Sequence, residues 1–380
     1  MIEQLVNFIR EQYRTNGDIP LHAPVFRGRE REYLLDTVDT TYVSSIGSYV
    51  DCFERDVAQF VGSPSAVAVV NGTAALHIAL KLAGVKENDF VITQALTFIA
   101  TCNAIAYCGA SPLFIDVDLR TLGLSPKALE EWLSENAFLN DEGVCFAKNV
   151  NRRISACVPM HTFGHPVDVD ALIIVCKKWN LAIVEDAAES LGSFYKGRHT
   201  GTFGLIGTLS FNGNKILTTG GGGMLLTDHK TAKQAKHITT TAKIPHRYEF
   251  IHDDIAYNYR LPNLNAAMGC AQIEQLDEFL VSKRLLAKRY IEFFSHSNLT
   301  PIVEPSDCRS NYWLNGVICE DRRERDFILN ATNSQGIMTR PIWTLMTRLP
   351  MFKASISGQL VNSLWLEDRV INLPSSVLPD

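Results

Sequence analysis

The sequence lacks the patterns that mark several classes of protein. Its nine cysteines include no Cys-x-x-Cys pair, so we expect buried, reduced thiols and no disulfide framework or metal site. No uncharged apolar run reaches the roughly 18 residues of a membrane span, and no cluster of Lys and Arg suggests a nucleic-acid partner. The segment Met1 to Glu11 lacks the basic start and apolar core of a signal peptide, so we expect a cytoplasmic protein.

What remains is the composition of an ordinary globular enzyme. The 380 residues are 46% apolar and 20% charged, with a formal net charge of −5, which is usual for such proteins. Buried strands are expected at 66–70, 90–93, 113–116, 154–158 and 181–185, with helices at 73–82, 99–107 and 168–180. Apolar strands separated by helices predict an α/β fold with a mostly parallel sheet that is covered on both faces.

After about residue 245 the pattern changes. Two long amphipathic helices are expected at 261–280 and 282–295, followed by a strand-like segment at 312–318 and a helix near 323–330. We therefore predict a large α/β domain with an N-terminal arm over residues 1–245, and a smaller α+β domain over residues 246–380.

A candidate phosphate site lies where the first buried strand turns into a helix. The sequence there is Asn71-Gly72-Thr73-Ala74, and its small residues leave backbone N–H groups free at the helix start. Such a terminus binds phosphate through those groups and the helix dipole, and Thr73 can add its hydroxyl. An ordinary capped turn has the same sequence pattern, so this motif alone leaves both interpretations open.

Two carboxylates, Glu185 and Asp186, stand at the end of the strand expected at 181–185. Ligands of open α/β sheets bind beyond the carboxyl ends of the strands, which favours Asp186 as a ligand-binding residue. A carboxylate there can keep a pyridine nitrogen protonated and so make the ring an electron sink. A structural salt bridge is the alternative for Asp186, and Glu185 is expected to be structural.

Lys215 stands between the polar segment that begins at Ser210 and the glycines 220–223. It has no acidic neighbour in the local sequence, and a partly buried lysine of this kind can act as a Schiff-base nucleophile. The order Gly-Lys-Ser/Thr of a Walker loop is missing. Alone, this lysine resembles an exposed turn residue, but the order of phosphate turn, Phe98, Asp186 and Lys215 indicates a site for pyridoxal 5′-phosphate (PLP). Ser210 would bind its phosphate and Phe98 would stack on its ring, although a Phe at a helix start is more often part of the core.

These segments resemble the DegT-type nucleotide-sugar aminotransferases over nearly the whole chain, from Ile19 to Pro374. The matching stretches are Val43–Glu54, Asn71–Leu76, Glu185–Ala188, Ser210–Lys215 and Tyr257–Arg260. The resemblance implies the PLP-dependent transferase fold type I, with a mostly parallel mixed sheet. It also implies a homodimer that shares its active sites, so that each subunit gives and receives the same contacts.

The resemblance implies a role for individual residues. Lys215 would form the Schiff base with PLP and move the proton between substrate and cofactor, and Asn258 would reach the phosphate of the neighbouring subunit. Contacts to the cofactor are expected from Gly72, Thr73, Ala74, Phe98, Asp186, Glu189, Ser210, Lys215 and Asn258. Contacts to the substrate are expected from Gly47, Ser48, Tyr49, His161, Arg340 and Trp343.

Two positions depart from many members of that family. Glu189 stands where others have Gln or His beside the phenolic oxygen of PLP, and another anion there is unfavourable unless it is protonated or turned away. The segment from Arg340 to Pro350 contains no His, whereas many relatives have one before a Pro. Either another group assists the reaction, or the sugar is held differently.

The resemblance implies a reaction in two halves. Glutamate gives its amino group to the cofactor, and pyridoxamine 5′-phosphate then gives it to a keto sugar. The segments Val43–Tyr49 and Arg340–Trp343 resemble those of 4-aminotransferases that act on UDP-linked 4-keto-6-deoxy-N-acetylamino sugars in the synthesis of surface polysaccharides.

Three alternatives remain at this point. A sugar dehydratase of the same fold carries His where this chain has Lys215, which counts against it. A non-catalytic PLP-binding regulator would carry a DNA-binding helical module, and the sequence shows none. A metalloenzyme built on His161 and His165 lacks the Glu of a His-Glu-x-x-His motif, so these histidines are more simply turn residues.

Overall fold

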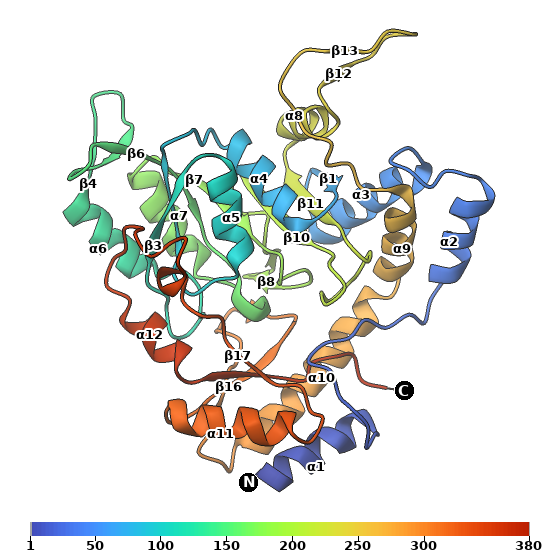
Figure 1. Cartoon of the computed structure of the whole chain (residues 1–380), viewed down its shortest axis with the longest axis vertical. Coiled ribbons are helices and arrows are strands. Elements are labelled where there is room, and N and C mark those ends of the chain that lie inside the picture. The colour runs from blue at the N-terminus through green and yellow to red at the C-terminus, as the bar shows by residue number, and fades with distance from the viewer. Residues whose placement is uncertain (1, 380) are drawn as a thin grey trace.

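The computed structural model describes residues 2–379 and confirms the expected α/β fold with a mostly parallel central sheet (Figure 1). The main path of the sheet runs in the order β1 (Ser65–Val69), β11 (Gly223–Thr227), β10 (Ile206–Ser210), β7 (Ala182–Asp186), β6 (Arg152–Val158), β2 (Phe90–Gln94) and β3 (Ser111–Ile115). β11 is antiparallel to both of its neighbours, and the other pairs along this path are parallel. A hairpin of β4 (Ala137–Leu139) and β5 (Cys145–Ala147) extends the sheet beside β6.

Helices cover both faces of this sheet. One face packs against α4 (Gly72–Leu82), α5 (Ile99–Tyr107) and α8 (His229–Thr239). The other packs against α3 (Ser48–Val61), α6 (Pro126–Asn136), α7 (Val169–Lys178) and α9 (Asn263–Ile273). In β2, Phe90 and Ile92 belong to the core on one face and Val91 to the core on the other. Apolar side chains on both faces of one strand therefore explain why the sheet is covered twice.

The helix break predicted between residues 280 and 282 is wrong. The chain turns instead at Glu274 and Gln275, between α9 and α10 (Leu276–Phe294). These two residues keep nearly helical backbone angles, and neither Gly nor Pro marks the turn. The sequence therefore carries no local signal for the break. The strand expected at 312–318 is also shorter, because β16 covers Asn315–Ile318.

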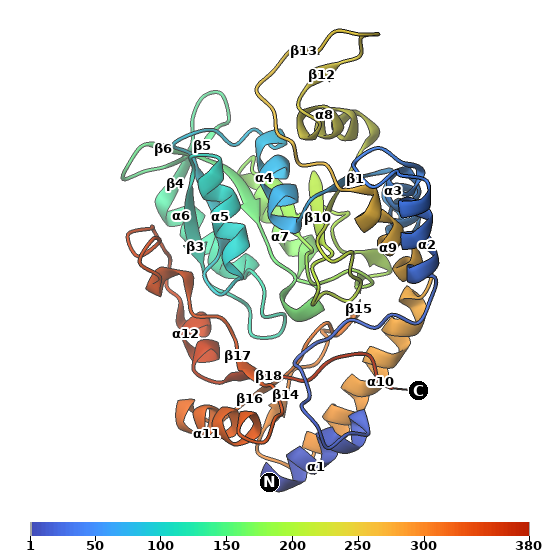
Figure 2. The ribbon, with the colours of Figure 1, turned by 45° about the vertical axis from the view of Figure 1, so that its right-hand side comes forward.

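A second, antiparallel sheet lies at the opposite end of the molecule from the β12–β13 hairpin (Figures 1 and 2). Its order is β14 (Thr300–Pro301), β16, β18 (Val370–Leu373) and β17 (Arg340–Pro341). It packs against α1 (Ile2–Tyr13), α10 and α11 (Arg322–Asn333), whose buried side chains include Leu5, Leu286 and Ile328.

Two helices bear on the predicted division of the chain at residues 245 and 246. α1 belongs to the first predicted domain but packs with the C-terminal sheet. α9 belongs to the second but packs on α3 and on α2 (Glu30–Asp39) of the first. The boundary itself stays a prediction. The contacts show that α1 packs with the C-terminal sheet, and that the chain passes from the large α/β core to the C-terminal core at α9 and α10.

The remaining elements are short. β8 (Phe194–Tyr195), β9 (Arg198–His199) and β15 (Cys308–Arg309) form a small sheet, and η1 (Thr162–Gly164), η2 (Met346–Arg348) and α12 (Val361–Glu367) lie in loops. β12 (Lys243–Ile244) and β13 (Ile251–His252) form a hairpin that projects from the body. Within residues 2–379, no helix has both the length and the apolar character that crossing a membrane demands.

Candidate active site

A cavity of about 680 Å³ lies at the carboxyl ends of β7 and β10. This volume is typical of small-molecule sites. Nine of the residues predicted from the sequence line it: Gly72, Thr73, Phe98, Asp186, Glu189, Ser210, Lys215, Arg340 and Trp343. The fold therefore brings together residues that the sequence keeps far apart.

The start of α4 forms one end of the cavity. Asn71 caps the helix, and its Oδ1 accepts a hydrogen bond from the backbone N–H of Ala74 at 2.8 Å. A Cβ on Gly72 would lie 2.9 Å from the Cβ of Ser210, so glycine lets the helix start approach β10 closely. The N–H groups of Gly72 and Thr73 have no partner within the helix. Together with the hydroxyls of Thr73 and Ser210, they form a set of donors that suits a phosphate dianion.

Asp186 lies at the end of β7 and is buried. Its Oδ2 accepts a hydrogen bond from the hydroxyl of Thr101 at 2.6 Å, and its Oδ1 accepts one from the N–H of Ala188 at 3.2 Å. These donors fix the orientation of the carboxylate at the end of the strand. Phe98 lines the same cavity, with its ring centroid 6.4 Å from that of Trp343. A carboxylate and an aromatic ring are thus both available to a bound pyridine.

Lys215 extends into the cavity from the loop after β10. Its Nζ lies 3.9 Å from the centre of the Trp313 ring and 3.5 Å from Oε1 of Glu189. The indole N–H of Trp313 donates to the carbonyl of Asn214 at 2.7 Å, which fixes the ring beside the lysine. The amine therefore has an aromatic face on one side and a carboxyl group within reach, although no acid is near it in the sequence.

Glu189 is turned toward Lys215 and not away from it. Its Oε2 accepts the backbone N–H of Phe163 at 2.9 Å. Burial raises the pKa of Glu189 to about 7, against the lowering effects of Lys215 and of the Phe163 N–H, while Asp186 raises it further. Near neutral pH the carboxyl group of Glu189 can take a proton. The repulsion that a second negative charge would cause in the site is therefore reduced.

Two residues with predicted contacts, His161 and Ala74, are not among those that line the cavity. His161 is fully buried; its Nε2 lies 3.1 Å from Oε2 of Glu185, and its Nδ1 accepts the N–H of Val167 at 3.2 Å. This environment gives no support to a substrate contact by His161, which stays a prediction, and it agrees with the structural role expected for Glu185. Ala74 is likewise buried, with its N–H bonded to Asn71.

Other predicted residues lie outside the cavity of the same chain. Gly47 precedes α3 as its N-cap, and Ser48 and Tyr49 begin the helix; a Cβ on Gly47 would collide with the side chain of Asn263. Asn258 pairs with Thr240 in an isolated bridge, and its Oδ1 accepts a hydrogen bond from Nε of Arg260 at 2.9 Å. Their contacts to substrate, and across a dimer to phosphate, stay predictions.

Several residues of the site were missed in the sequence. Trp313, Leu21, Met160 and Asn372 line the cavity, and Thr101 holds Asp186. Thr101 belongs to the segment around Phe98. Its hydroxyl in the first turn of the expected helix was the one sequence feature that could have indicated a polar contact in the site. For Trp313 the sequence offers none, because its place beside Lys215 depends on the packing of the C-terminal sheet.

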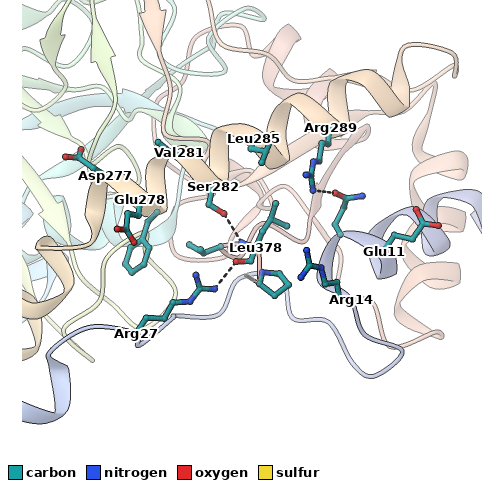
Figure 3. Close-up of a pocket in the computed structure, with 14 residues that line it drawn as sticks. Glu11, Arg14, Arg27, Asp277, Glu278, Val281, Ser282, Leu285, Arg289 and Leu378 are labelled. Atoms are coloured by element: carbon teal, nitrogen blue, oxygen red, sulfur yellow. Dashed lines mark hydrogen bonds between the residues drawn. The ribbon is translucent and has the colours of Figure 1, made fainter.

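A second cavity of about 720 Å³ lies between α1, α10 and the C-terminal segment (Figure 3). Its wall is held by hydrogen bonds from Arg27 to the carbonyl of Leu378, from the N–H of Leu378 to Ser282, and from Arg289 to Gln12. None of the residues predicted to bind cofactor or substrate is among its described lining residues. The cavity around Lys215 is therefore the candidate active site, although it is slightly smaller.

Comparisons with known proteins point to one family. The model of the DegT/DnrJ/EryC1/StrS aminotransferase family matches residues 25–378. GDP-perosamine synthase of Escherichia coli O157:H7 is 36% identical over 365 residues, covering 94% of this chain and 93% of that protein. GDP-perosamine synthase of Vibrio cholerae is 32% identical, with 94% of both chains covered. The crystal structure of the aminotransferase TlmJ from Streptoalloteichus hindustanus gives a TM-score of 0.85 at 26% identity, also with 94% of both chains covered.

Proposed function

We propose that this chain, which belongs to the DegT/DnrJ/EryC1/StrS aminotransferase family, moves an amino group from glutamate to a UDP-linked 4-keto-6-deoxy-N-acetylamino sugar. The chain is a PLP-dependent sugar aminotransferase. The observation that carries the proposal is the meeting of Lys215, Asp186 and Ser210 in one cavity. A reactive amine, a carboxylate and a phosphate-binding hydroxyl are what a PLP site needs together.

The residues present fit the cofactor. When bound, PLP supplies a carbonyl that condenses with amines and a ring that withdraws electrons from the bond being broken. Ser210 and the first turn of α4 would hold its phosphate, and Asp186 would pair with its ring nitrogen. Lys215 would bond to its carbonyl carbon, with Phe98 against the ring.

Lys215 is also the proton carrier of the proposed reaction. Its amine lies in a cavity that buries most of its side chain, so water competes poorly for the proton. A positioned side chain that transfers protons contributes roughly 10²- to 10⁴-fold to a rate. Trp313, fixed by its indole hydrogen bond, keeps the lysine on one side of the cavity.

The choice of a UDP-linked N-acetylamino sugar rests on two segments. Val43–Tyr49 and Arg340–Trp343 resemble those of aminotransferases with such substrates, and Arg340 and Trp343 line the cavity. Arg340 is exposed and offers a positive charge to a diphosphate. A GDP-linked keto sugar is the second candidate, because two relatives are named GDP-perosamine synthase.

A homodimer is part of the proposal. Asn258 lies outside the cavity of its own chain, which suits a contact with the phosphate site of a second copy. A monomeric mass in solution, measured by light scattering at the concentration of the assay, would rule out this role for Asn258. The cytoplasmic location expected from the sequence stays a prediction.

The test is a substrate comparison with purified protein. Protein, PLP and glutamate are incubated with UDP-linked 4-keto-6-deoxy-N-acetylamino sugar or with GDP-linked 4-keto-6-deoxy sugar, and amino sugar is detected by mass spectrometry. We expect amination of the UDP-linked sugar and none with Lys215→Ala. Amination of the GDP-linked sugar alone would select the second candidate, and the absence of 2-oxoglutarate formation would exclude glutamate as the donor.

A further inference from the structure

Glu189 and Lys215 form a pair of opposite charges that is almost closed to water. Oε1 of Glu189 lies 3.5 Å from Nζ of Lys215, and the two side chains are 2% and 12% exposed. Desolvation of both charges offsets much of their attraction. Burial raises the pKa of Glu189 to about 7, so its carboxyl group is protonated in part of the molecules near neutral pH.

The surrounding chain fixes the carboxyl group of Glu189 in this direction. Phe163, which donates its N–H to Oε2, has a φ of 57° and is fully buried. Asn311 donates its side-chain amide to the backbone carbonyl of Glu189 at 2.9 Å. A Cβ on the neighbouring Gly164 would lie 1.8 Å from Oδ1 of Asn311, so glycine is required there. The turn of η1 and Asn311 thus hold both ends of Glu189.

The charged and titratable groups around the pair come from several elements. Asp186 at the end of β7 raises the pKa of Glu189, in addition to the larger effect of burial. His22 is close enough to Lys215 to feel its charge, but burial lowers the pKa of His22 well below its ordinary value, so this ring is neutral. Trp313 presents an uncharged face to Nζ. Near neutral pH, the carboxyl group of Glu189 can therefore both accept and release a proton.

We propose that Glu189 is a second acid–base group of the reaction, which exchanges a proton with Lys215 each time that lysine leaves the cofactor or returns to it. This inference rests on the proposed function. With Lys215 free of the cofactor and present as an ammonium, one of its N–H bonds breaks and an O–H bond forms at Oε1 of Glu189. The nitrogen keeps its electron pair and becomes the free base that takes a proton from the substrate. Return of the proton restores the starting pair, so no other reactant is needed.

The distance between the two atoms is compatible with such a transfer. Direct proton transfer needs about 2.6–3.2 Å between heavy atoms, or one bridging water, and these contacts are often longer before ligands bind. The observed 3.5 Å is slightly longer than this range, as such contacts often are before ligands bind. Glu189 would also supply the acid–base group that the segment after Arg340 lacks.

The first arm of the test needs no activity. Infrared difference spectra of the apo-protein are recorded from mildly acidic to mildly alkaline pH, for wild type, Glu189→Gln and the control Glu304→Gln. Glu304 is paired with Arg284 at 2.7 Å outside the cavity. We expect a carbonyl band of a protonated carboxyl group that disappears around pH 7, survives in Glu304→Gln and is absent from Glu189→Gln. A wild-type spectrum without such a band would overturn the proposal.

The second arm measures the half-reaction with glutamate in the holoenzyme. Glu189→Gln is expected to slow the single-turnover absorbance change roughly 10²-fold and to remove the limb near pH 7 from its pH profile, while Glu189→Asp restores part of both. An unchanged rate and profile in Glu189→Gln would also overturn the proposal. If wild type itself fails to react with glutamate, the proposed donor is wrong, and the infrared arm still decides the state of Glu189.

Discussion

Two poorly exposed lysines of this protein show what makes such a residue reactive. Lys215 has 12% of its side chain exposed and faces a cavity, a carboxyl group and the ring of Trp313. Lys283 of α10 is fully buried, and its Nζ donates to the backbone carbonyls of Trp313, at 3.1 Å, and of Ser375. Burial lowers the pKa of Lys283 to about 7. Lys283 combines a depressed pKa with no exposed surface, so a depressed pKa alone does not make an amine available for chemistry.

Trp313 connects the two lysines. Its carbonyl accepts the hydrogen bond of Lys283, and its ring lies against Lys215. The fully buried lysine therefore supports the fold, by tying α10 to the segment before β16 that carries Trp313 to the active site. Substituting each lysine in turn distinguishes a role in the reaction from a role in the stability of the fold.

The largest effect is expected from removing the two amines separately. Lys215→Ala should lose the covalent adduct with PLP and slow the glutamate half-reaction by about 10⁴-fold or more, because nucleophile and proton carrier disappear together. Lys283→Met should keep the adduct. Absorbance spectra of the two variants with PLP check this, and an adduct that is lost from Lys283→Met but kept in Lys215→Ala would reverse the assignment.

A smaller loss is expected at the carboxylate that serves the ring of the cofactor. Asp186→Asn keeps the hydrogen bond from Thr101 but removes the charge that would stabilise a protonated ring nitrogen. We expect the glutamate half-reaction to slow by roughly 10²- to 10³-fold, as when one preorganised electrostatic partner is lost. The covalent adduct of Lys215 should still form. Stopped-flow absorbance measures the rate, and a rate close to that of wild type would contradict the role of Asp186.

Lys283 should appear in the pH dependence of stability. Its pKa falls from the ordinary 10.5 to about 7 on folding, so between these values the unfolded chain binds more protons than the folded one. The contribution of this residue to stability is greatest above 10.5, declines as the pH falls, and levels off below about 7.

Urea unfolding of the apo-protein at pH 7 and pH 9 tests this linkage. Wild type should gain up to about 1.4 kcal/mol of unfolding free energy per pH unit from this group. Lys283→Met should lack that part of the slope, and comparison of the two proteins cancels the contribution of other titrating groups. Parallel slopes in the two proteins would show that Lys283 keeps its proton in the folded state.

The smallest effect is expected at the residue between the two lysines. Trp313→Phe keeps an aromatic face for Lys215 but removes the indole hydrogen bond to Asn214. We expect a loss of about 1 kcal/mol in unfolding free energy and a change of only a few-fold in turnover. Trp313→Leu, which has no ring, serves as the comparison. If both variants have the same turnover, the aromatic face is not needed.

Much of the site could be predicted because parallel strands bring their carboxyl ends to one edge. Asp186 ends β7 and Ser210 ends β10, so their meeting follows from the strand pattern alone. The direction of Glu189 could not be predicted, since it depends on the unusual backbone of Phe163 and on Asn311. Two further features could not be predicted, because neither leaves a local signal in the sequence. They are the packing of α1 on the C-terminal sheet and the turn at Glu274 and Gln275.

The central claim is that Lys215, and not Lys283 or another lysine, carries PLP. The direct measurement is reduction of the PLP-loaded protein with borohydride, followed by proteolysis and peptide mass spectrometry. A phosphopyridoxyl group on Lys215, which is lost when the protein meets glutamate before reduction, is the predicted result. Label on Lys283 or elsewhere, or a wild-type protein that takes up no label, would contradict the claim.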